Sequence, residues 1–329
     1  MTEQTENPRR YLDPHVLAQV QGLDLRARLV VEGYLSGLHP SPVHGFSVEF
    51  AQHREYVPGD DIKHVDWKVY ARTERHFVKQ HEDETDVACW LLLDVSESMS
   101  YGSGALTKYD LAAVTAASVA HLVLRQRDRV GAITFDDHIR EIVRPSGRHS
   151  NIDEITRALA NGVRGGGTTR LGAMLHEIAK RLDRRGLVIL ISDLFDDLDE
   201  VQSGLQHLRH GRHEIILFHV LDAAELDFPF EEPVLFRGME GFQDLATDPL
   251  SLRRRYLSKV SAFVSDVEQG CRQRQIDYVQ LRTDAPLGEA LSRYLAHRTR
   301  GRKVYRGISQ RVRSSRSRGD GSAGDSTCA

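Results

Sequence analysis

The sequence predicts an α/β domain built on a doubly wound parallel sheet, with a small β-rich subdomain before it. Apolar runs such as Val87–Leu93 are continuous, which is typical of strands that are buried on both faces of a sheet. Helical patterns of ten or more residues separate these runs, as βαβ units require. A chain of 329 residues is also long enough for one large domain with an elaboration.

The N-terminal part of the chain changes character twice. Residues 1–12 are expected to be disordered because they begin with a polar stretch. A helical pattern then runs from about Pro14 to Ser36 and stops at Gly37 and Pro40. Turn signals and short extended segments such as 76–79 follow, and these favour strands. Residues 13–85 are therefore expected to form a helix and a β-rich subdomain.

The α/β domain is expected over residues 86–298, where apolar runs and helical periodicity alternate. Strands are predicted at 87–94, 129–135, 187–191, 214–221 and 277–281, and helices at 109–124, 152–160, 171–182, 199–208, 252–271 and 287–297. The helix at 109–124 is apolar on nearly all sides, which predicts burial at the centre of the domain. Residues 299–329, rich in Ser, Arg and Gly, are expected to form a disordered basic tail.

Charge and cysteine content narrow the class of protein. A net charge of -3 gives the whole chain no bias toward nucleic acid or membranes. The tail differs, because Arg298–Arg318 holds only basic charges. It is interpreted as a solvated extension, and nonspecific binding to nucleic acid, anionic lipid or an acidic protein surface stays an alternative.

Three widely spaced cysteines without a C-x-x-C pair favour a reducing compartment. With no leader pattern and no apolar stretch of ~20 residues, the prediction is a soluble, cytoplasmic protein without a transmembrane segment.

Two predicted strands end in aspartate, at the edge of the sheet where doubly wound folds bind ligands. The first strand leads into Asp94-Val-Ser96-Glu-Ser98, in which oxygen-bearing side chains recur at every second residue and so point to one side. The second leads into Ser192-Asp193. Between them, glycines 165–167 precede Thr168 and Thr169, two hydroxyls just before a helix, of which Thr168 is favoured as a ligand because it directly follows the glycines. The same glycine run lacks the Gly-Lys-Ser/Thr ending of a phosphate-binding loop, so nucleotide binding is not expected.

These side chains form a set of hard oxygen ligands. Two carboxylates and several hydroxyls, with no His or Cys beside them, suit Mg²⁺ or Mn²⁺. Asp94 and Asp193 together just neutralise a divalent ion, which leaves it electrophilic, with at least one of about six positions open. An acidic side chain of a partner protein could fill that position. The alternative is purely structural, since Asp and Ser also favour turns and helix caps.

The arrangement of Asp94, Ser96, Ser98, Thr168 and Asp193 resembles the metal-ion-dependent adhesion site of von Willebrand factor type A domains, whose fold is the doubly wound sheet. A longer, ordered series of motifs resembles the bacterial domain-of-unknown-function family fifty-eight. These motifs are Gly37-Leu-His39-x-Ser41-Pro42, Gly45-x-Ser47-x-Glu49-Phe50, Arg54-x-Tyr56-x-Pro58-Gly59-Asp60-Asp61, Asp66-Trp67-Lys68 and Ala71-Arg72-Thr73. The similarity extends from about Leu12 to Arg298.

The resemblance implies a non-enzymatic, metal-dependent protein-interaction module. That family is associated with MoxR-type AAA+ ATPases, which implies an adaptor or chaperone-like role in protein maturation or complex assembly. The expected partners are such an ATPase and a client protein with an exposed carboxylate; nucleic acid is not the expected partner. The implied metal ligands are Asp94, Ser96, Ser98, Thr168 and Asp193, with Mg²⁺ or Mn²⁺ as the cofactor and no catalytic residue.

Three residues depart from the adhesion-site pattern. Leu194 follows the second aspartate where many such domains have glycine, and Val95 and Glu97 fill spaces where small residues are usual. Glu97 could add charge to the site. It is also the one local candidate for a general base, which keeps a metal-dependent phosphoester hydrolase as an alternative function.

Two further groups have both a structural and a functional interpretation. The acidic residues of the segment Pro58–Trp67 could form a partner surface or a second acidic site, or could pair with nearby Arg and Lys in a rigid turn. His207, His210 and His213 have a spacing compatible with metal binding, although histidines at a helix end also interact favourably with the helix dipole.

Overall fold

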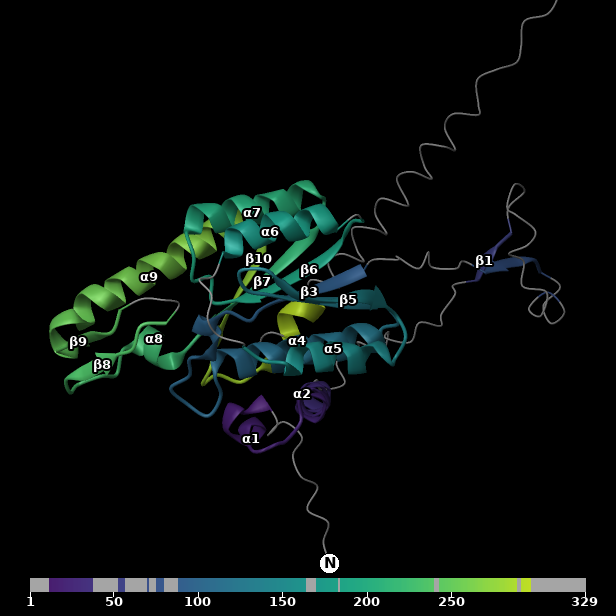
Figure 1. The fold of residues 1–329 in the computed structure, drawn as a ribbon. Coiled ribbons are helices and arrows are strands. Elements are labelled where there is room, and N and C mark those ends of the chain that lie inside the picture. The colour runs from purple at the N-terminus through teal and green to yellow at the C-terminus, as the bar shows by residue number, and fades with distance from the viewer. Residues whose placement is uncertain are drawn as a thin grey trace, which may run out of the picture.

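A computed structural model describes residues 12–37, 53–56, 70, 75–79, 88–163, 170–182, 184–239, 243–288 and 291–296. Its centre is a six-stranded sheet with helices packed on both faces (Figure 1). The strand order is β10-β7-β6-β3-β4-β5. The strands are β3 (Ala88–Asp94), β4 (Arg129–Phe135), β5 (Ile139–Ser146), β6 (Gly186–Ser192), β7 (Glu214–Leu221) and β10 (Asp277–Arg282). The predicted α/β class, with a doubly wound and mainly parallel sheet, is confirmed.

The edge strand β5 was not predicted, and it is the antiparallel member of the sheet. Residues 136–138 join β4 to β5, which is far too short for a crossover to a parallel strand, so the chain turns back on itself. The strand is mostly half-exposed and contains Pro145, which an edge strand tolerates. It therefore lacks the continuous apolar run by which the central strands were predicted.

The core lies in two layers, one on each face of the sheet. Alternate residues of β3 enter opposite layers: Leu91 and Leu93 pack on one side and Leu92 on the other. The first layer contains α2 (Leu23–Gly37), α4 (Lys108–Arg125) and α5 (Asn151–Ala160). The second contains α6 (Leu171–Arg181), α7 (Leu198–His210) and α9 (Pro249–Gln273). Helix α4 lies between the sheet and α2, which confirms its predicted central burial (Figure 1).

The predicted single helix from Pro14 to Ser36 is wrong, because the structure has two helices there. Asp13 caps α1 (Pro14–Ala18) by accepting a hydrogen bond from the His15 amide at 2.8 Å. The chain then breaks at Gly22, where φ is +86°, a left-handed conformation that interrupts a helix and that glycine accommodates. Helix α2 starts afresh at Leu23.

Little of the predicted β-rich subdomain falls within the described residues. Two short antiparallel strands are present there, β1 (His53–Glu55) and β2 (Phe77–Lys79), with Arg54 opposite Val78. They agree with the extended segment expected at 76–79. The motifs at Pro58–Trp67 and the basic tail lie outside the described residues, and the boundaries at 12, 85 and 298 stay predictions.

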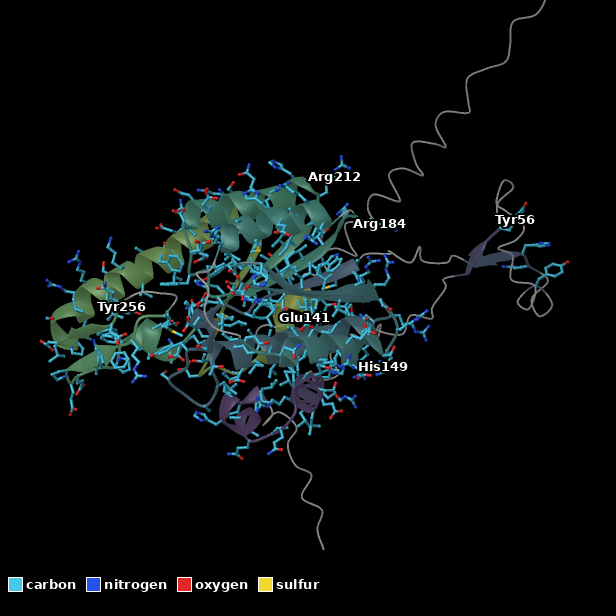
Figure 2. All side chains as sticks on the ribbon, viewed as in Figure 1. Tyr56, Glu141, His149, Arg184, Arg212 and Tyr256 are labelled. Atoms are coloured by element: carbon cyan, nitrogen blue, oxygen red, sulfur yellow. The ribbon has the colours of Figure 1, made fainter. Side chains whose placement is uncertain are left out.

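An extension not expected from the sequence follows β7. It consists of α8 (Ala223–Asp227), the antiparallel pair β8 (Val234–Phe236) and β9 (Leu245–Thr247), and the first part of α9, which lie together at one end of the molecule (Figure 1). Phe228 packs against Phe236 and Tyr256, with ring centroids 5.9 and 4.6 Å apart. Figure 2 labels Tyr256 on this extension. Residues 291–296 are helical, as predicted, and bury Leu291 and Tyr294. In the described ranges, no helix combines the length and apolar character that crossing a membrane requires.

Candidate metal centre

The carboxyl ends of β3 and β6 lie side by side at the centre of the sheet. The two strands pair in parallel, with Leu93 opposite Ile191, so Asp94 and Asp193 follow at the same edge. From β3 the chain proceeds through β4 and β5 on one side of the sheet and through β6, β7 and β10 on the other. The strand order thus reverses between β3 and β6, which is the place in the sheet where doubly wound folds bind ligands.

Asp94 is fully buried and accepts hydrogen bonds at both carboxylate oxygens. Ser192 Oγ lies 2.6 Å from Asp94 Oδ2, and the Ser96 amide donates to Asp94 Oδ1 at 2.9 Å. The Oγ atoms of Ser96 and Ser98 are 3.1 Å apart, within hydrogen-bond distance. Spacing at every second residue therefore does bring these three side chains to one side.

Asp193 joins the same network from β6. It receives a hydrogen bond from the Ser98 side chain and another from the Phe195 amide, the latter at 3.2 Å to Oδ1. Asp94, Ser96, Ser98 and Asp193, four of the five predicted ligands, are thus buried together in one connected network. Thr168 lies outside the described residues.

The two carboxylates have opposite electrostatic environments. Burial, and then the negative charge of Asp193, raise the pKa of Asp94 to about 7. Burial would also raise the pKa of Asp193, but the charge and hydrogen bond of Lys108 outweigh burial and hold this pKa below its ordinary value. Asp193 is thus the more firmly ionised of the pair.

Lys108 was missed by the sequence analysis, although it touches the site. Its side chain is 3 % exposed, and Nζ lies 2.7 Å from Asp193 Oδ2 and 2.7 Å from Glu225 Oε1. Burial disfavours the ammonium ion, yet the charges of Asp193 and Glu225 raise the pKa of Lys108 above its ordinary value. A lysine at the start of a helix that is otherwise apolar on nearly all sides was the available signal, because a buried lysine needs a carboxylate partner.

The donor set fits a hard divalent cation such as Mg²⁺ or Mn²⁺. Buried carboxylate and hydroxyl oxygens from two adjacent strand ends provide ligands of the right chemistry, while the buried His219 Nε2 lies 3.1 Å from the backbone carbonyl oxygen of Asp193. The Lys108 ammonium beside Asp193 is a cationic group in contact with these donors.

The structure explains why leucine is tolerated at position 194, and it shows where Glu97 lies. Leu194 has φ of +57°, the left-handed conformation that glycine favours, while its side chain is fully buried in the second core layer. Glu97 begins a short 3-10 helix, Glu97–Ser100, and is half-buried beside the donor residues.

The other candidate clusters have local partners. Asp136, Asp137 and His138 form a group with metal-ligand spacing, but Arg140 pairs with Asp136 and His138 Nδ1 lies 2.6 Å from Asp137. His207, predicted as part of a possible histidine site, instead lies with its Nδ1 3.0 Å from Nδ1 of His176 on the neighbouring helix α6.

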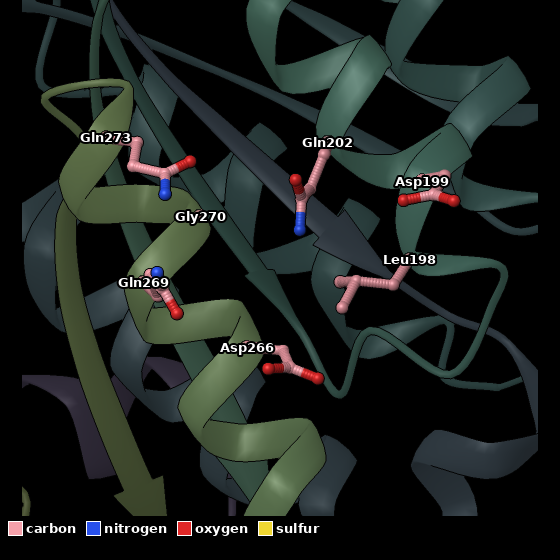
Figure 3. A pocket seen from close by; sticks show the side chains of 7 residues that line it. All are labelled: Leu198, Asp199, Gln202, Asp266, Gln269, Gly270 and Gln273. Atoms are coloured by element: carbon pink, nitrogen blue, oxygen red, sulfur yellow. The ribbon is translucent and has the colours of Figure 1, made fainter.

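A shallow groove of about 240 Å³ lies between α7 and α9 (Figure 3). Its lining is polar and includes Asp199, Gln202, Asp266 and Gln273. Its described lining contains no histidine, cysteine or lysine. It supplies no alternative catalytic arrangement.

Mycobacterial proteins are similar to this chain over most of its length. It is 28 % identical over 297 residues to the uncharacterized protein Rv1480 of Mycobacterium tuberculosis, which covers 88 % of this chain and 92 % of the relative. The uncharacterized protein Mb1516 of Mycobacterium bovis matches with the same values.

Solved structures with a similar fold share little sequence with this chain. The conserved hypothetical protein BatB of Bacteroides thetaiotaomicron has a TM-score of 0.41 at 12 % identity, covering 65 % of this chain and 99 % of BatB. The VWA (von Willebrand factor type A) domain of SpRpn10 has a TM-score of 0.36 at 14 % identity, covering 62 % and 93 %. The model of the family described as "Protein of unknown function DUF58" matches residues 52–262, well over half of the sequence, and the chain belongs to that family.

Proposed function

We propose that this protein is a non-enzymatic, metal-dependent protein-interaction module. The observation that carries the proposal is the buried oxygen network at the ends of β3 and β6. Asp94, Ser96, Ser98 and Asp193 would hold Mg²⁺ or Mn²⁺, with Thr168 as a further expected donor. When bound, the ion supplies an electrophilic centre that can accept one more oxygen ligand. A carboxylate of a client protein is the ligand whose charge and hardness match it.

An exposed apolar side chain beside the network supports protein binding. Phe195 is 53 % exposed, two residues after Asp193, and its amide is hydrogen-bonded to the Asp193 carboxylate. An aromatic side chain next to a charged contact is a common anchor of protein interfaces. The client would thus contact the metal through an acidic side chain and Phe195 through an apolar one.

The partner we propose is a MoxR-type AAA+ ATPase, for which this chain would act as an adaptor that presents client proteins. Family membership supports this part of the proposal, because the family is associated with such ATPases. The role would lie in the maturation or assembly of protein complexes.

The test uses the full chain and its Asp94→Asn variant. It measures how much of an acidic client protein, and of a purified MoxR-type AAA+ ATPase with and without that client, each of them captures. This substitution keeps the size of the side chain and removes its charge. We expect capture of the client by the wild type in Mg²⁺ and its loss in EDTA or in the variant. Gln273→Ala, in the groove between α7 and α9, is the control and should capture normally. Client capture that persists in EDTA and in Asp94→Asn would show that the interaction does not use the metal.

A further inference from the structure

The candidate metal centre contains a cation of its own. Lys108 Nζ lies 2.7 Å from Asp193 Oδ2, and the two side chains are 3 % and 2 % exposed. A divalent ion bound by Asp193 would therefore approach a carboxylate that already has a positive partner. Two cations that share one carboxylate repel each other, and burial strengthens this repulsion because little water screens it.

The position of the ammonium is set by a helix cap. Thr107 and Asp110 form a capping box at the N-terminus of α4, with Thr107 Oγ1 accepting from the Asp110 amide at 3.0 Å. Lys108 is the first residue of that helix, and its amide donates to the Tyr101 carbonyl at 2.8 Å. The backbone at Lys108 is thus fixed, and movement of the ammonium is confined to its flexible side chain.

Glu225 offers the ammonium a second carboxylate, which is also held by a helix cap. Asp222 caps α8, and Glu225 Oε2 accepts a hydrogen bond from the Asp222 amide at 2.8 Å. The other oxygen, Oε1, lies 2.7 Å from Lys108 Nζ. A lysine that loses Asp193 would therefore keep a charged partner without leaving its place.

The negative charges of these side chains exceed the positive charge of Lys108. Lys108 pairs with the carboxylates of Asp193 and Glu225, and Asp94 adds a third carboxylate to the same site. When all three are ionised, two negative charges are left over, which is the charge that one divalent ion neutralises.

We propose that Lys108 is an internal counter-ion that competes with the metal for Asp193, and that Glu225 retains the ammonium when the metal binds. This inference rests on the proposed function, since it concerns the same site. In consequence, the site binds the metal less tightly than the same oxygen donors would in the absence of Lys108. It also connects occupation of the site to α8, where the extension begins.

The experiment measures Mn²⁺ binding to the full chain, by electron paramagnetic resonance and calorimetry, after removal of metal with a chelator. We expect Lys108→Met to bind Mn²⁺ at least tenfold more tightly than the wild type. Lys108→Gln, which can still donate a hydrogen bond to Asp193, should also bind more tightly and serves if Lys108→Met does not fold. Arg181→Gln removes a positive charge that pairs with Glu177 instead, and it should leave the Kd within twofold.

The role of Glu225 is tested by a double-mutant cycle. Glu225→Gln should weaken Mn²⁺ binding at least threefold when Lys108 is present, because the displaced ammonium loses its second carboxylate. The same substitution should have a smaller effect in Lys108→Met. An equal effect in both backgrounds would show that Glu225 acts as a distant charge and does not retain the ammonium.

The outcomes separate this inference from the proposed function. If Asp94→Asn abolishes Mn²⁺ binding but both Lys108 variants bind like the wild type, the metal centre stands and the competition is refuted. If the wild type binds no Mn²⁺ and a Lys108 variant does, the competition stands and metal-dependent capture by the natural protein is refuted. If no folded variant binds Mn²⁺, both are refuted.

Discussion

At the scale of single residues, Leu194 combines a strained backbone with a well-packed side chain. A left-handed φ costs a residue with a Cβ roughly 1–2 kcal/mol, whereas truncation of a buried leucine to alanine costs about 2–5 kcal/mol. Packing therefore outweighs strain, which explains how leucine occupies this position.

Substitutions of Leu194 should reverse the usual order of alanine and glycine. Both variants should lower the free energy of unfolding. At an ordinary φ, glycine would be the less stable by roughly 0.5–1 kcal/mol, but relief of the left-handed strain should make Leu194→Gly at least as stable as Leu194→Ala. Urea unfolding of the two variants measures this difference. A clear advantage for alanine would show that the backbone at 194 is not left-handed in solution.

The buried histidine His213 should make the fold sensitive to acid. It is fully buried, and burial lowers its pKa below the ordinary value of 6.5. The unfolded chain takes up the proton first as the pH falls, so the stability due to neutral His213 is complete above about pH 6.5 and declines below it.

Replacement of His213 by Gln should therefore flatten the pH dependence of stability. One proton contributes a slope of at most about 1.4 kcal/mol per pH unit. Urea unfolding at pH 8, 6.5 and 5 measures the effect, and the values at pH 8 report the packing change alone. If the wild type and the variant lose the same stability between pH 6.5 and 5, another group causes the acid sensitivity.

Sequence reasoning found the residues of the candidate site that follow strands, and missed two that do not. Asp94, Ser96, Ser98 and Asp193 stand next to apolar runs, so their shared edge followed from the parallel sheet. Lys108 and Glu225 come from the first turns of two helices and meet only in three dimensions. No local sequence pattern predicts the contact between these two side chains.

At the scale of elements, α6 and α7 pack closely through two glycines. A Cβ on Gly204 would lie 2.6 Å from the Leu175 Cβ and 3.0 Å from the Gly172 carbonyl oxygen. A Cβ on Gly172 would lie 2.7 Å from the backbone of Glu200. The two helices therefore approach each other only because neither position has a side chain.

Gly204→Ala should destabilise the protein even though alanine is the better helix former. The gain in helix propensity is about 1 kcal/mol, while overpacking costs roughly 1–3 kcal/mol, so we expect a net loss. Chemical unfolding measures it, with Gly104→Ala as the control because a Cβ there meets nothing within 4 Å. A Gly204→Ala protein more stable than the wild type would mean that the helices can move apart at no cost.

Prediction of elements succeeded where burial on both faces produces an uninterrupted apolar run, as in β6 and β7. It failed for β5, whose half-exposed edge position mixes polar and apolar residues, and for the break at Gly22, where helical periodicity continues across the interruption. The α8 and β8–β9 extension was missed because strands of three residues carry too few side chains to show a period.

At the scale of the whole molecule, the candidate metal centre joins the two halves of the sheet. One half continues from β3 into β4 and β5, and the other contains β6, β7 and β10. An ion shared by Asp94 and Asp193 would connect the ends of β3 and β6, which only the folded chain brings together. Metal binding should therefore stabilise the entire fold.

We expect Mn²⁺ at a hundredfold excess over its Kd to stabilise the wild type by about 2.7 kcal/mol relative to EDTA. For a domain of about 150–250 residues, each kcal/mol raises the Tm by roughly 2–4 °C, so the shift should be several degrees. Calorimetry of the full chain, with Asp94→Asn beside the wild type, measures this shift. Loss of the shift in the variant would place the stabilising ion between β3 and β6, whereas an equal shift in both proteins would place it elsewhere, with the exposed group around Asp137 as the first site to examine.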